Sequence, residues 1–147
     1  MAYSSRELLA RLIRCEAGGE GENGMKAVAN VIMNRVNVSY GEYLRTGQGV
    51  LRKVVFQPYQ FTCALTTING QVNPQTIYAV EPDELNYQIA DWALSGNKLW
   101  GVNSALWYYN PFSPNCAVYF PATKTGVYVT RIVQHCFYDP TPLYAQT

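Results

Sequence analysis

The sequence predicts an α+β fold in a single domain, and three observations lead to this prediction. Apolar residues recur at helical spacing in two segments near the start of the chain and in one near its middle. Beyond residue 104 the pattern changes to short runs rich in Tyr, Val, Thr and Phe, which Pro and Gly separate, as is typical of strands. The 147 residues, 48% of them hydrophobic and 14% charged, suffice for one compact core. We therefore expect one domain spanning 1–147, with its core at about 6–139.

A first helix is predicted over residues 6–16, with Ser4 or Ser5 as its N-cap. Its apolar stripe consists of Leu8, Leu9, Leu12 and Ile13. Glu16 stands four residues after Leu12 and three after Ile13, so it continues the apolar stripe and not the solvent face. A carboxyl group on the inward face of a helix is unusual and marks Glu16 as a functional candidate.

A second helix is predicted after a glycine-rich run at residues 18–24, which we expect to break the first helix because glycine is costly inside one. Its buried stripe is Met25, Val28, Ala29, Ile32 and Val36, with Lys26, Asn30, Asn34 and Arg35 spread around the remaining faces. The two helices would form an αα-hairpin with Glu16 near its corner.

The remaining elements are read from breakers and from strand-forming residues. Residues 38–58 are predicted as a loop with a short apolar piece at 50–56. A third helix should start near Pro82 or Asp83 and stop at residues 95–97, burying Leu85, Ile89, Trp92 and Ala93. Extended segments are predicted at 105–110, 117–120 and 127–137.

The charge and the aromatic content bear on possible partners. A formal charge of +1 gives no broad electrostatic reason to bind nucleic acid or an anionic membrane. Because no run approaches about 18 apolar residues and charges interrupt the apolar positions of the first segment, we expect neither a transmembrane helix nor a signal peptide. Its 12 Tyr, 3 Trp and 5 Phe suit a carbohydrate-binding groove, in which rings stack on sugars, and equally a small aromatic core.

The four cysteines are Cys15, Cys63, Cys116 and Cys136, one in each segment and without any CxxC spacing. Such spacing favours neither zinc nor a disulfide framework. We expect reduced, structural cysteines, in keeping with synthesis in the cytoplasm. No metal ion and no other cofactor is expected.

Glu16 is the sharpest candidate for chemistry. A carboxyl on an apolar face is desolvated, so its pKa should rise towards the range of a general acid. The alternative is a glutamate at a helix end whose carboxyl group points into solvent or caps a backbone amide. Glycosidases usually need two carboxyls, but the nearest ones, Glu20 and Glu22, lie in a glycine-rich setting typical of solvated loop charges.

Two further groups of residues admit both a functional and a structural interpretation. His135, the single histidine, lies in an apolar stretch where a hydrogen-bonded core histidine is common; with Cys15 it would instead form the thiolate and base of an amidase or peptidase. Tyr108, Tyr109 and Asn110 form an aromatic and amide cluster able to stack on sugars and to bond their acetamido groups. Alternate aromatic residues of a strand would equally form part of the core.

Several blocks, in this order, resemble the spore cortex-lytic cell-wall hydrolase family of the SleB/CwlJ type. They are Glu-Ala-Gly-Gly-Glu at 16–20 with Gly24, the helix 27–36 ending in Asn-Arg-Val, Gln-Pro-Tyr-Gln-Phe-Thr at 57–62, Tyr-Tyr-Asn-Pro at 108–111, and His-Cys-Phe-Tyr at 135–138. Together they span the chain from about residue 8 to residue 138.

The resemblance implies a small lysozyme-like fold, with a helical lobe and a smaller β lobe. It also implies cleavage of peptidoglycan after N-acetylmuramic acid, at the cell wall or the spore cortex, by a lytic transglycosylase or a muramidase. Glu16 falls on the family's catalytic glutamate, with Glu20 as a second catalytic candidate. The substrate-binding positions are Phe61, Thr62, Tyr108, Tyr109, Asn110 and His135. The implied partner is the glycan strand, bound by a monomer.

In a lytic transglycosylase the C6 hydroxyl of muramic acid closes a 1,6-anhydro ring, so one carboxyl can serve as acid and then as base. We expect Glu16 to take this part, with Thr62 and a tyrosine hydroxyl orienting the sugar. One alternative is hydrolysis, in which Glu20 or another carboxylate activates a water. The others are a non-catalytic peptidoglycan-binding module and the Cys15/His135 amidase.

Overall fold

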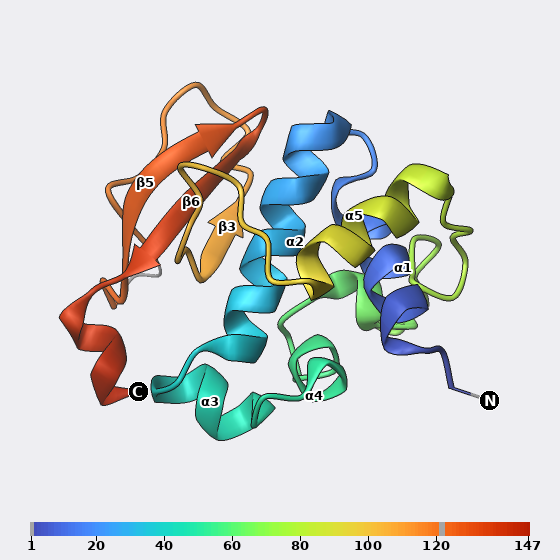
Figure 1. The fold of residues 1–147 in the computed structure, drawn as a ribbon, viewed down its shortest axis with the longest axis horizontal. Coiled ribbons are helices and arrows are strands. Elements are labelled where there is room, and N and C mark those ends of the chain that lie inside the picture. Colours follow the sequence, from blue (N-terminus) through green and yellow to red (C-terminus); the bar gives the residue numbers. More distant parts are fainter. Residues whose placement is uncertain (1, 121–122) are drawn as a thin grey trace.

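The computed structural model describes residues 2–120 and 123–147 and shows an α+β molecule, as predicted, with helices on one side and a small sheet on the other (Figure 1). The helices are α1 (Ser5–Ala17), α2 (Gly21–Asn37), α3 (Gly41–Gly47), α4 (Leu51–Val55) and α5 (Glu84–Leu94), with 3-10 turns η1 (Thr62–Ala64) and η2 (Pro142–Gln146). The sheet has the antiparallel order β3 (Trp107–Tyr109), β6 (His135–Pro140), β5 (Gly126–Ile132) and β4 (Tyr119–Phe120). No helix among the described residues is both long and apolar enough to span a bilayer.

The predicted helical hairpin is confirmed, with one correction at its corner. The Ser4 hydroxyl accepts a hydrogen bond from the Glu7 N–H at 3.1 Å, which caps α1 as expected. Helix α2 begins at Gly21, inside the glycine run that was predicted to be a break. A helix tolerates such residues in its first turn because those N–H groups need no partner within the helix.

Polar side chains of α2 are buried and clamp the chain that leads into the sheet. Asn34 donates to the carbonyls of Asn103 and Ala105 at 2.7 and 2.8 Å, and Asn30 donates to Asn103 at 3.0 Å. The Arg35 Nε donates to the Leu106 carbonyl at 2.7 Å. These bonds fix the start of β3 against the middle of the helical lobe.

The predicted loop at 38–58 is wrong in part, because it contains the short helices α3 and α4. Helices of this length are not stable on their own, so tertiary contacts must hold them. The Tyr144 hydroxyl accepts from the Tyr43 N–H at 3.1 Å, and both rings lie in a buried aromatic cluster with Trp107. The sequence pattern of α3 alone carries no sign of this docking.

The third helix is confirmed, since Asp83 caps α5 through a capping box with Asn86. The extended segment predicted over 127–137 is a hairpin, β5 and β6, which turns at Val133, where φ is +53°.

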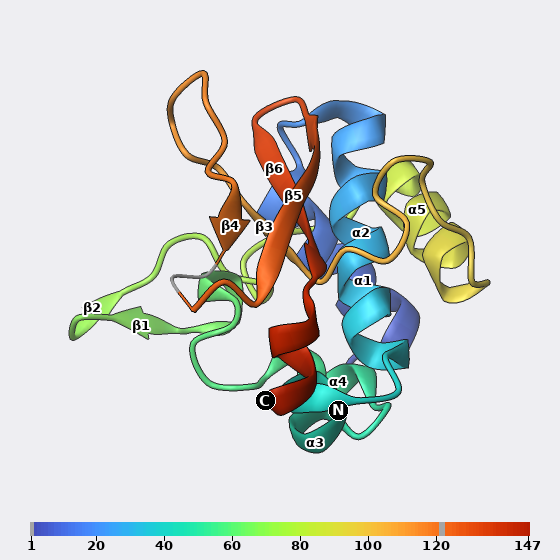
Figure 2. The same ribbon diagram turned by 90° about the vertical axis from the view of Figure 1, so that its left-hand side faces the viewer.

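A second hairpin, β1 (Thr67–Ile68) and β2 (Gln71–Val72), was not predicted; it projects from the body of the molecule in Figure 2. Its Asn-Gly turn at 69–70 is a strong hairpin signal.

The expectation of reduced cysteines is wrong, because all four are paired. Cys15 is bonded to Cys63, with Cα atoms 6.1 Å apart, and Cys116 to Cys136, with Cα atoms 5.9 Å apart. Both separations suit a disulfide. Spacing along the chain did not reveal the pairs, because folding brings together residues 48 and 20 positions apart.

Candidate active site

The Glu16 carboxyl lies at the end of α1, half-buried, with a neighbour at each oxygen. The Tyr108 hydroxyl donates a hydrogen bond to Oε1 at 2.8 Å. The Sγ of Cys63 lies 3.0 Å from Oε2. The side chain does not point freely into bulk solvent, so the alternative of a solvated helix-end glutamate is excluded.

Burial raises the pKa of the Glu16 carboxyl above its usual range, because the charged form loses hydration. The hydrogen bond from Tyr108 and the charge interactions with Arg35 and His135 act against this and lower the pKa of Glu16. Since burial has the largest effect, the net shift is upward. A carboxyl whose proton is retained to higher pH is suited to general acid catalysis.

Tyr108 reaches Glu16 from β3, on the face of that strand that looks towards α1 and α2. Burial, together with the negative charge of Glu16, raises the pKa of the Tyr108 hydroxyl well above its usual range. The hydroxyl therefore stays protonated and remains a donor. Its place depends on the Arg35 bond to Leu106, two residues upstream in the chain.

Glu20 and His135 form a close pair beside this centre. The Glu20 Oε1 lies 2.7 Å from Nδ1 of His135 and also accepts from the Gln134 N–H at 3.3 Å. Their side chains are only 11% and 14% exposed, so Glu20 is not a solvated loop charge. The His135 ring meets the Tyr108 ring edge to face at 5.3 Å. Glu20 thus holds the His135 ring by a hydrogen bond, and the His135 ring packs against the Tyr108 ring.

Gly24 gives Glu20 the room that this pair needs. A Cβ at Gly24 would stand 2.4 Å from the Glu20 Cβ and 3.7 Å from a methyl of Val133, in the β5–β6 turn. Even the methyl group of an alanine at this position would therefore displace Glu20. This explains why a glycine lies one helical turn after Glu20.

Arg35 belongs to the site and was not selected from the sequence. Its guanidinium is buried, lies over the rings of Tyr43 and Phe61 at 4.7 and 5.3 Å, and acts on Glu16 by its charge. The family block that ends in Asn-Arg-Val was the one signal for it, because helical spacing merely excluded it from the apolar stripe.

The other predicted binding residues differ in their exposure and in their position relative to Glu16. Thr62 is exposed at the start of η1, next to Cys63, whereas Phe61 is buried in the core. Tyr109 points to the opposite face of β3 from Tyr108 and stacks on Phe120 at 5.2 Å. Asn110 donates to the Gln134 side chain at 3.0 Å and fixes the loop beside His135.

A hollow of about 310 Å³, which we call the Tyr108 pocket, adjoins the acid through Tyr108. It is lined by Arg35, Glu42, Tyr43, Tyr59, Gln60, Trp107, Tyr108 and Phe120. The Tyr59 side chain at its rim is 92% exposed, an unusual place for a large ring. Aromatic rings with amide and charged groups between them suit a carbohydrate ligand.

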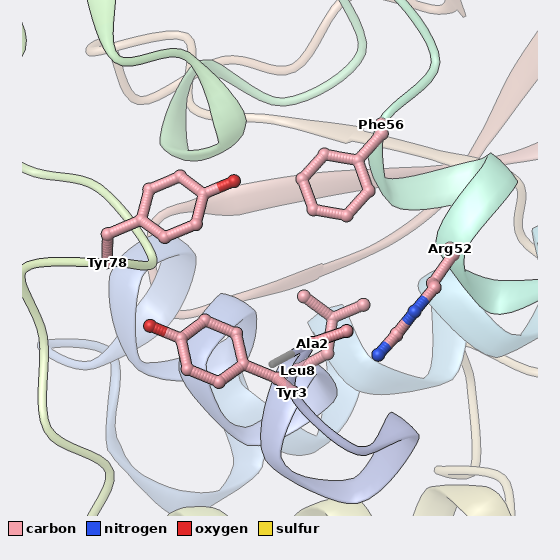
Figure 3. Close-up of a pocket in the computed structure, with 6 residues that line it drawn as sticks. All are labelled: Ala2, Tyr3, Leu8, Arg52, Phe56 and Tyr78. Atoms are coloured by element: carbon pink, nitrogen blue, oxygen red, sulfur yellow. The ribbon is translucent and has the colours of Figure 1, made fainter.

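A second hollow, of about 300 Å³, is drawn in Figure 3 and involves different residues. The rings of Tyr3, Phe56 and Tyr78 turn towards one another there, with Arg52 at the side (Figure 3). Neither Glu16 nor a residue that bonds to it lines this hollow. This hollow is therefore separate from the Glu16 site.

The alternative of a Cys15/His135 amidase or peptidase is excluded by the pairing of both residues. Cys15 is held in the disulfide with Cys63 and has no thiol to ionise. The Nδ1 atom of His135 is engaged by Glu20. A thiolate nucleophile with an adjacent base is not formed.

Comparison with known proteins agrees with this geometry. The sequence model of a family described as Cell Wall Hydrolase matches residues 19–138. The cell wall hydrolase CwlJ of Bacillus subtilis is 30% identical over 135 residues, which cover 92% of this chain and 84% of that protein. The CwlJ of Halalkalibacterium halodurans is 28% identical, with 92% and 85% covered.

Two solved structures share the fold. The catalytic domain of the germination-specific lytic transglycosylase SleB from Bacillus anthracis superimposes with a TM-score of 0.63 at 25% identity, covering 94% of this chain and 98% of that one. The catalytic domain of the Bacillus cereus SleB protein gives 0.61 at 27% identity, covering 94% and 93%. The family match starts three residues after Glu16.

Proposed function

This chain belongs to the cell wall hydrolase family, and from that premise we propose that it cleaves peptidoglycan glycan strands after N-acetylmuramic acid as a lytic transglycosylase, with Glu16 as the acid. The observation that carries the proposal is the half-buried Glu16 carboxyl, whose pKa burial raises, held by Tyr108 beside an aromatic pocket. A carboxyl that keeps its proton to higher pH than an exposed glutamate is suited to protonate a glycosidic oxygen.

A single carboxyl supports transglycosylation over hydrolysis. A hydrolase usually uses a second carboxylate, as nucleophile or to activate water. Glu20, the nearest acid in sequence, is engaged by His135, and among residues 2–120 and 123–147 no other acid hydrogen-bonds to Glu16. The C6 hydroxyl of the muramic acid would then take the place of that second group.

The steps use one side chain twice. Protonated Glu16 gives its proton to the oxygen that leaves C1 of the muramic acid, and the C1–O bond breaks. The C6 oxygen then bonds to C1, and its proton passes to the Glu16 carboxylate, which restores the acid. No water is consumed, and the products are a 1,6-anhydro end and a free 4-hydroxyl. Tyr108 keeps one carboxyl oxygen fixed while the other exchanges the proton.

The sugar chain would lie along the Tyr108 pocket. Tyr59 offers an exposed ring for stacking, and the Thr62 hydroxyl is exposed next to Cys63, which contacts the acid. Asn110 stands beside His135 with its amide fixed by Gln134. These groups supply the stacking and hydrogen bonding that an uncharged polysaccharide backbone requires.

The disulfides fit work at the cell wall or the spore cortex. Disulfides form and persist in oxidising surroundings and are rare in the reducing cytosol. With all four cysteines paired, the chain is suited to act outside the cytoplasm, whatever its place of synthesis.

The test is Glu16→Gln on purified peptidoglycan. Glutamine keeps the size and a hydrogen bond with Tyr108 but has no acid proton, so we expect cleavage to fall by at least about 10³-fold while the fold is kept. Release of soluble glycan from sacculi measures the rate, and circular dichroism checks the fold. A Glu16→Gln protein that solubilises sacculi at the wild-type rate would overturn the assignment.

Product masses decide the reaction type. Anhydro ends are lighter than reducing ends by one water and are expected throughout; reducing ends would mean a muramidase. Binding to sacculi without any soluble product from the wild type would mean a non-catalytic binding module. Cortex and vegetative peptidoglycan compared side by side identify the preferred substrate.

A further inference from the structure

The Cys15–Cys63 disulfide touches the acid itself, and the reaction proposed above assigns it no part. Cys15 directly precedes Glu16 in α1, and Cys63 lies in η1, with its Sγ 3.0 Å from Oε2 of Glu16. The bond therefore joins the helix that carries the acid to the segment that covers it. The second disulfide, Cys116–Cys136, makes no such contact: Cys136 lies in the aromatic cluster with Tyr43 and Tyr138.

The segment around Cys63 is held by further bonds. The Cys63 carbonyl accepts from the Ile77 N–H at 3.0 Å, and the Thr62 carbonyl accepts from the Asn73 side chain at 3.0 Å. The position of the sulfur over Oε2 is thus fixed from both sides, by the covalent bond to α1 and by the chain that follows η1.

The chemistry of the sulfur matters because the two carboxyl oxygens are not equivalent. Tyr108 donates to Oε1, which leaves Oε2 to carry the acid proton. A thiol at Cys63 could donate a hydrogen bond to Oε2 and so stabilise the charged form. A disulfide sulfur has no proton to donate, and it fills space that water would otherwise occupy.

We propose that the Cys15–Cys63 disulfide is a positioning element of the active site, which holds a sulfur without a proton against Oε2 of Glu16 and so keeps that oxygen protonated. This inference rests on the proposed function of Glu16. The other groups that face the carboxyl are the Tyr108 hydroxyl from β3, Arg35 from α2 and His135 from β6, the last paired with Glu20. All three favour the ionised form, so the sulfur side is where the carboxyl is sheltered from a donor.

The test compares two variants that both lack the bond. In C15A/C63S the serine hydroxyl places a donor near Oε2, and in C15A/C63V a methyl group fills the space of the sulfur without one. We expect the alkaline limb of the pH–rate profile to fall at lower pH in C15A/C63S, by about one pH unit, because the added hydrogen bond lowers the pKa of Glu16. In C15A/C63V the limb should stay within a few tenths of a unit of the wild-type position.

A purely structural role predicts a different result. If the bond only cross-links the chain, both variants lose the same amount of thermal stability and keep the same pH profile, and that outcome would overturn the proposal. The C116A/C136A variant, which lacks the distant bond, should also keep the wild-type profile. Absence of glycan cleavage by the wild type would instead contradict the proposed function.

Thermal melting first establishes that each variant is folded at the assay temperature. Should either variant be unfolded, the same comparison is made in C116A/C136A with and without dithiothreitol, whose oxidation to the cyclic disulfide supplies two electrons and two protons to give two thiols. Cys15 lines a surface hollow of about 310 Å³ and is open to such a reagent. The reduced protein should then show the lower alkaline limb, and an unchanged limb would reject the proposal.

Discussion

At the scale of single residues, the site is governed by opposing effects on one carboxyl. Burial disfavours the charged form of Glu16, while Tyr108, Arg35 and His135 favour it. Because burial outweighs the three, the acid keeps its proton to higher pH than an exposed glutamate. Removing any one favouring group should therefore shift the pKa of Glu16 further upward.

Tyr108→Phe tests this balance. Loss of the hydroxyl removes a hydrogen bond that lowers the pKa of Glu16, so the alkaline limb of the pH–rate profile should move to higher pH. The rate should fall by about 10- to 100-fold, because the carboxyl loses the bond that orients it. A limb that moved to lower pH would contradict the assigned direction of this hydrogen bond.

The raised pKa also has a consequence for stability. A carboxyl whose folded pKa lies above its unfolded value stabilises the fold below the unfolded pKa, and this contribution is lost as pH rises through the folded pKa. Glutamine does not titrate, so Glu16→Gln should melt at a higher temperature than the wild type at pH 7. The difference should shrink below about pH 4, where glutamate is protonated in both states.

Differential scanning calorimetry at several pH values measures this difference. The exposed Glu22→Gln removes one negative charge without opening or filling the site, and it is the matched control. Equal melting temperatures for Glu16→Gln and the wild type at pH 7 would show that burial does not raise the pKa of the Glu16 carboxyl.

At the scale of elements, the site is assembled where the sheet meets the helices. The β5–β6 turn brings Gln134 and His135 to Glu20 at the start of α2, and β3 brings Tyr108 to the end of α1 (Figures 1 and 2). The position of the sheet therefore determines which groups contact Glu16 and Glu20, and that position depends on packing inside the sheet.

Gly126 is a glycine of β5 with no room for a side chain. A Cβ there would lie 2.3 Å from the Phe120 carbonyl oxygen and 2.9 Å from the Trp107 ring, so strands β4 and β5 would have to separate. We expect Gly126→Ala to lower the free energy of unfolding by about 2 kcal/mol, measured by urea denaturation. Gly19→Ala, whose Cβ would have no neighbour within 4 Å, should change it by less than about 0.5 kcal/mol. Equal effects would argue against this packing.

At the scale of the whole molecule, the two disulfides close loops in different parts of the fold. One joins α1 to η1 beside the acid, and the other joins the loop before β4 to β6. With all four cysteines paired, the described fold is suited to oxidising surroundings, in which disulfides persist.

Loss of the distant bond should affect stability alone. In C116A/C136A a loop of 20 residues is no longer closed, and we expect the free energy of unfolding to fall by about 3 kcal/mol in urea titrations. Titration of the unfolded wild-type protein with a thiol reagent should find no free thiol. Detection of two or four thiols would show that the bonds are not formed.

Features that depend on neighbours along the chain were predicted correctly from residue order. The spacing of apolar residues placed α1, α2 and α5 and put Glu16 on the inward face, and Ser4 and Asp83 capped their helices as residue type and position predict. The family blocks added the fold and the reaction class. These features are local, because helical periodicity and capping involve residues at most a few positions apart.

Contacts between distant residues could not be predicted in this way, because they depend on how the sheet packs against the helices. Tyr108 bonds to Glu16 across 92 positions and His135 to Glu20 across 115, and the cysteines pair across 48 and 20. The direction of Tyr109 away from the acid followed only from the register of β3 with β6. Spacing cannot encode such contacts, since four cysteines allow three pairings and a strand can present either face; the packing of the sheet against the helices selects one.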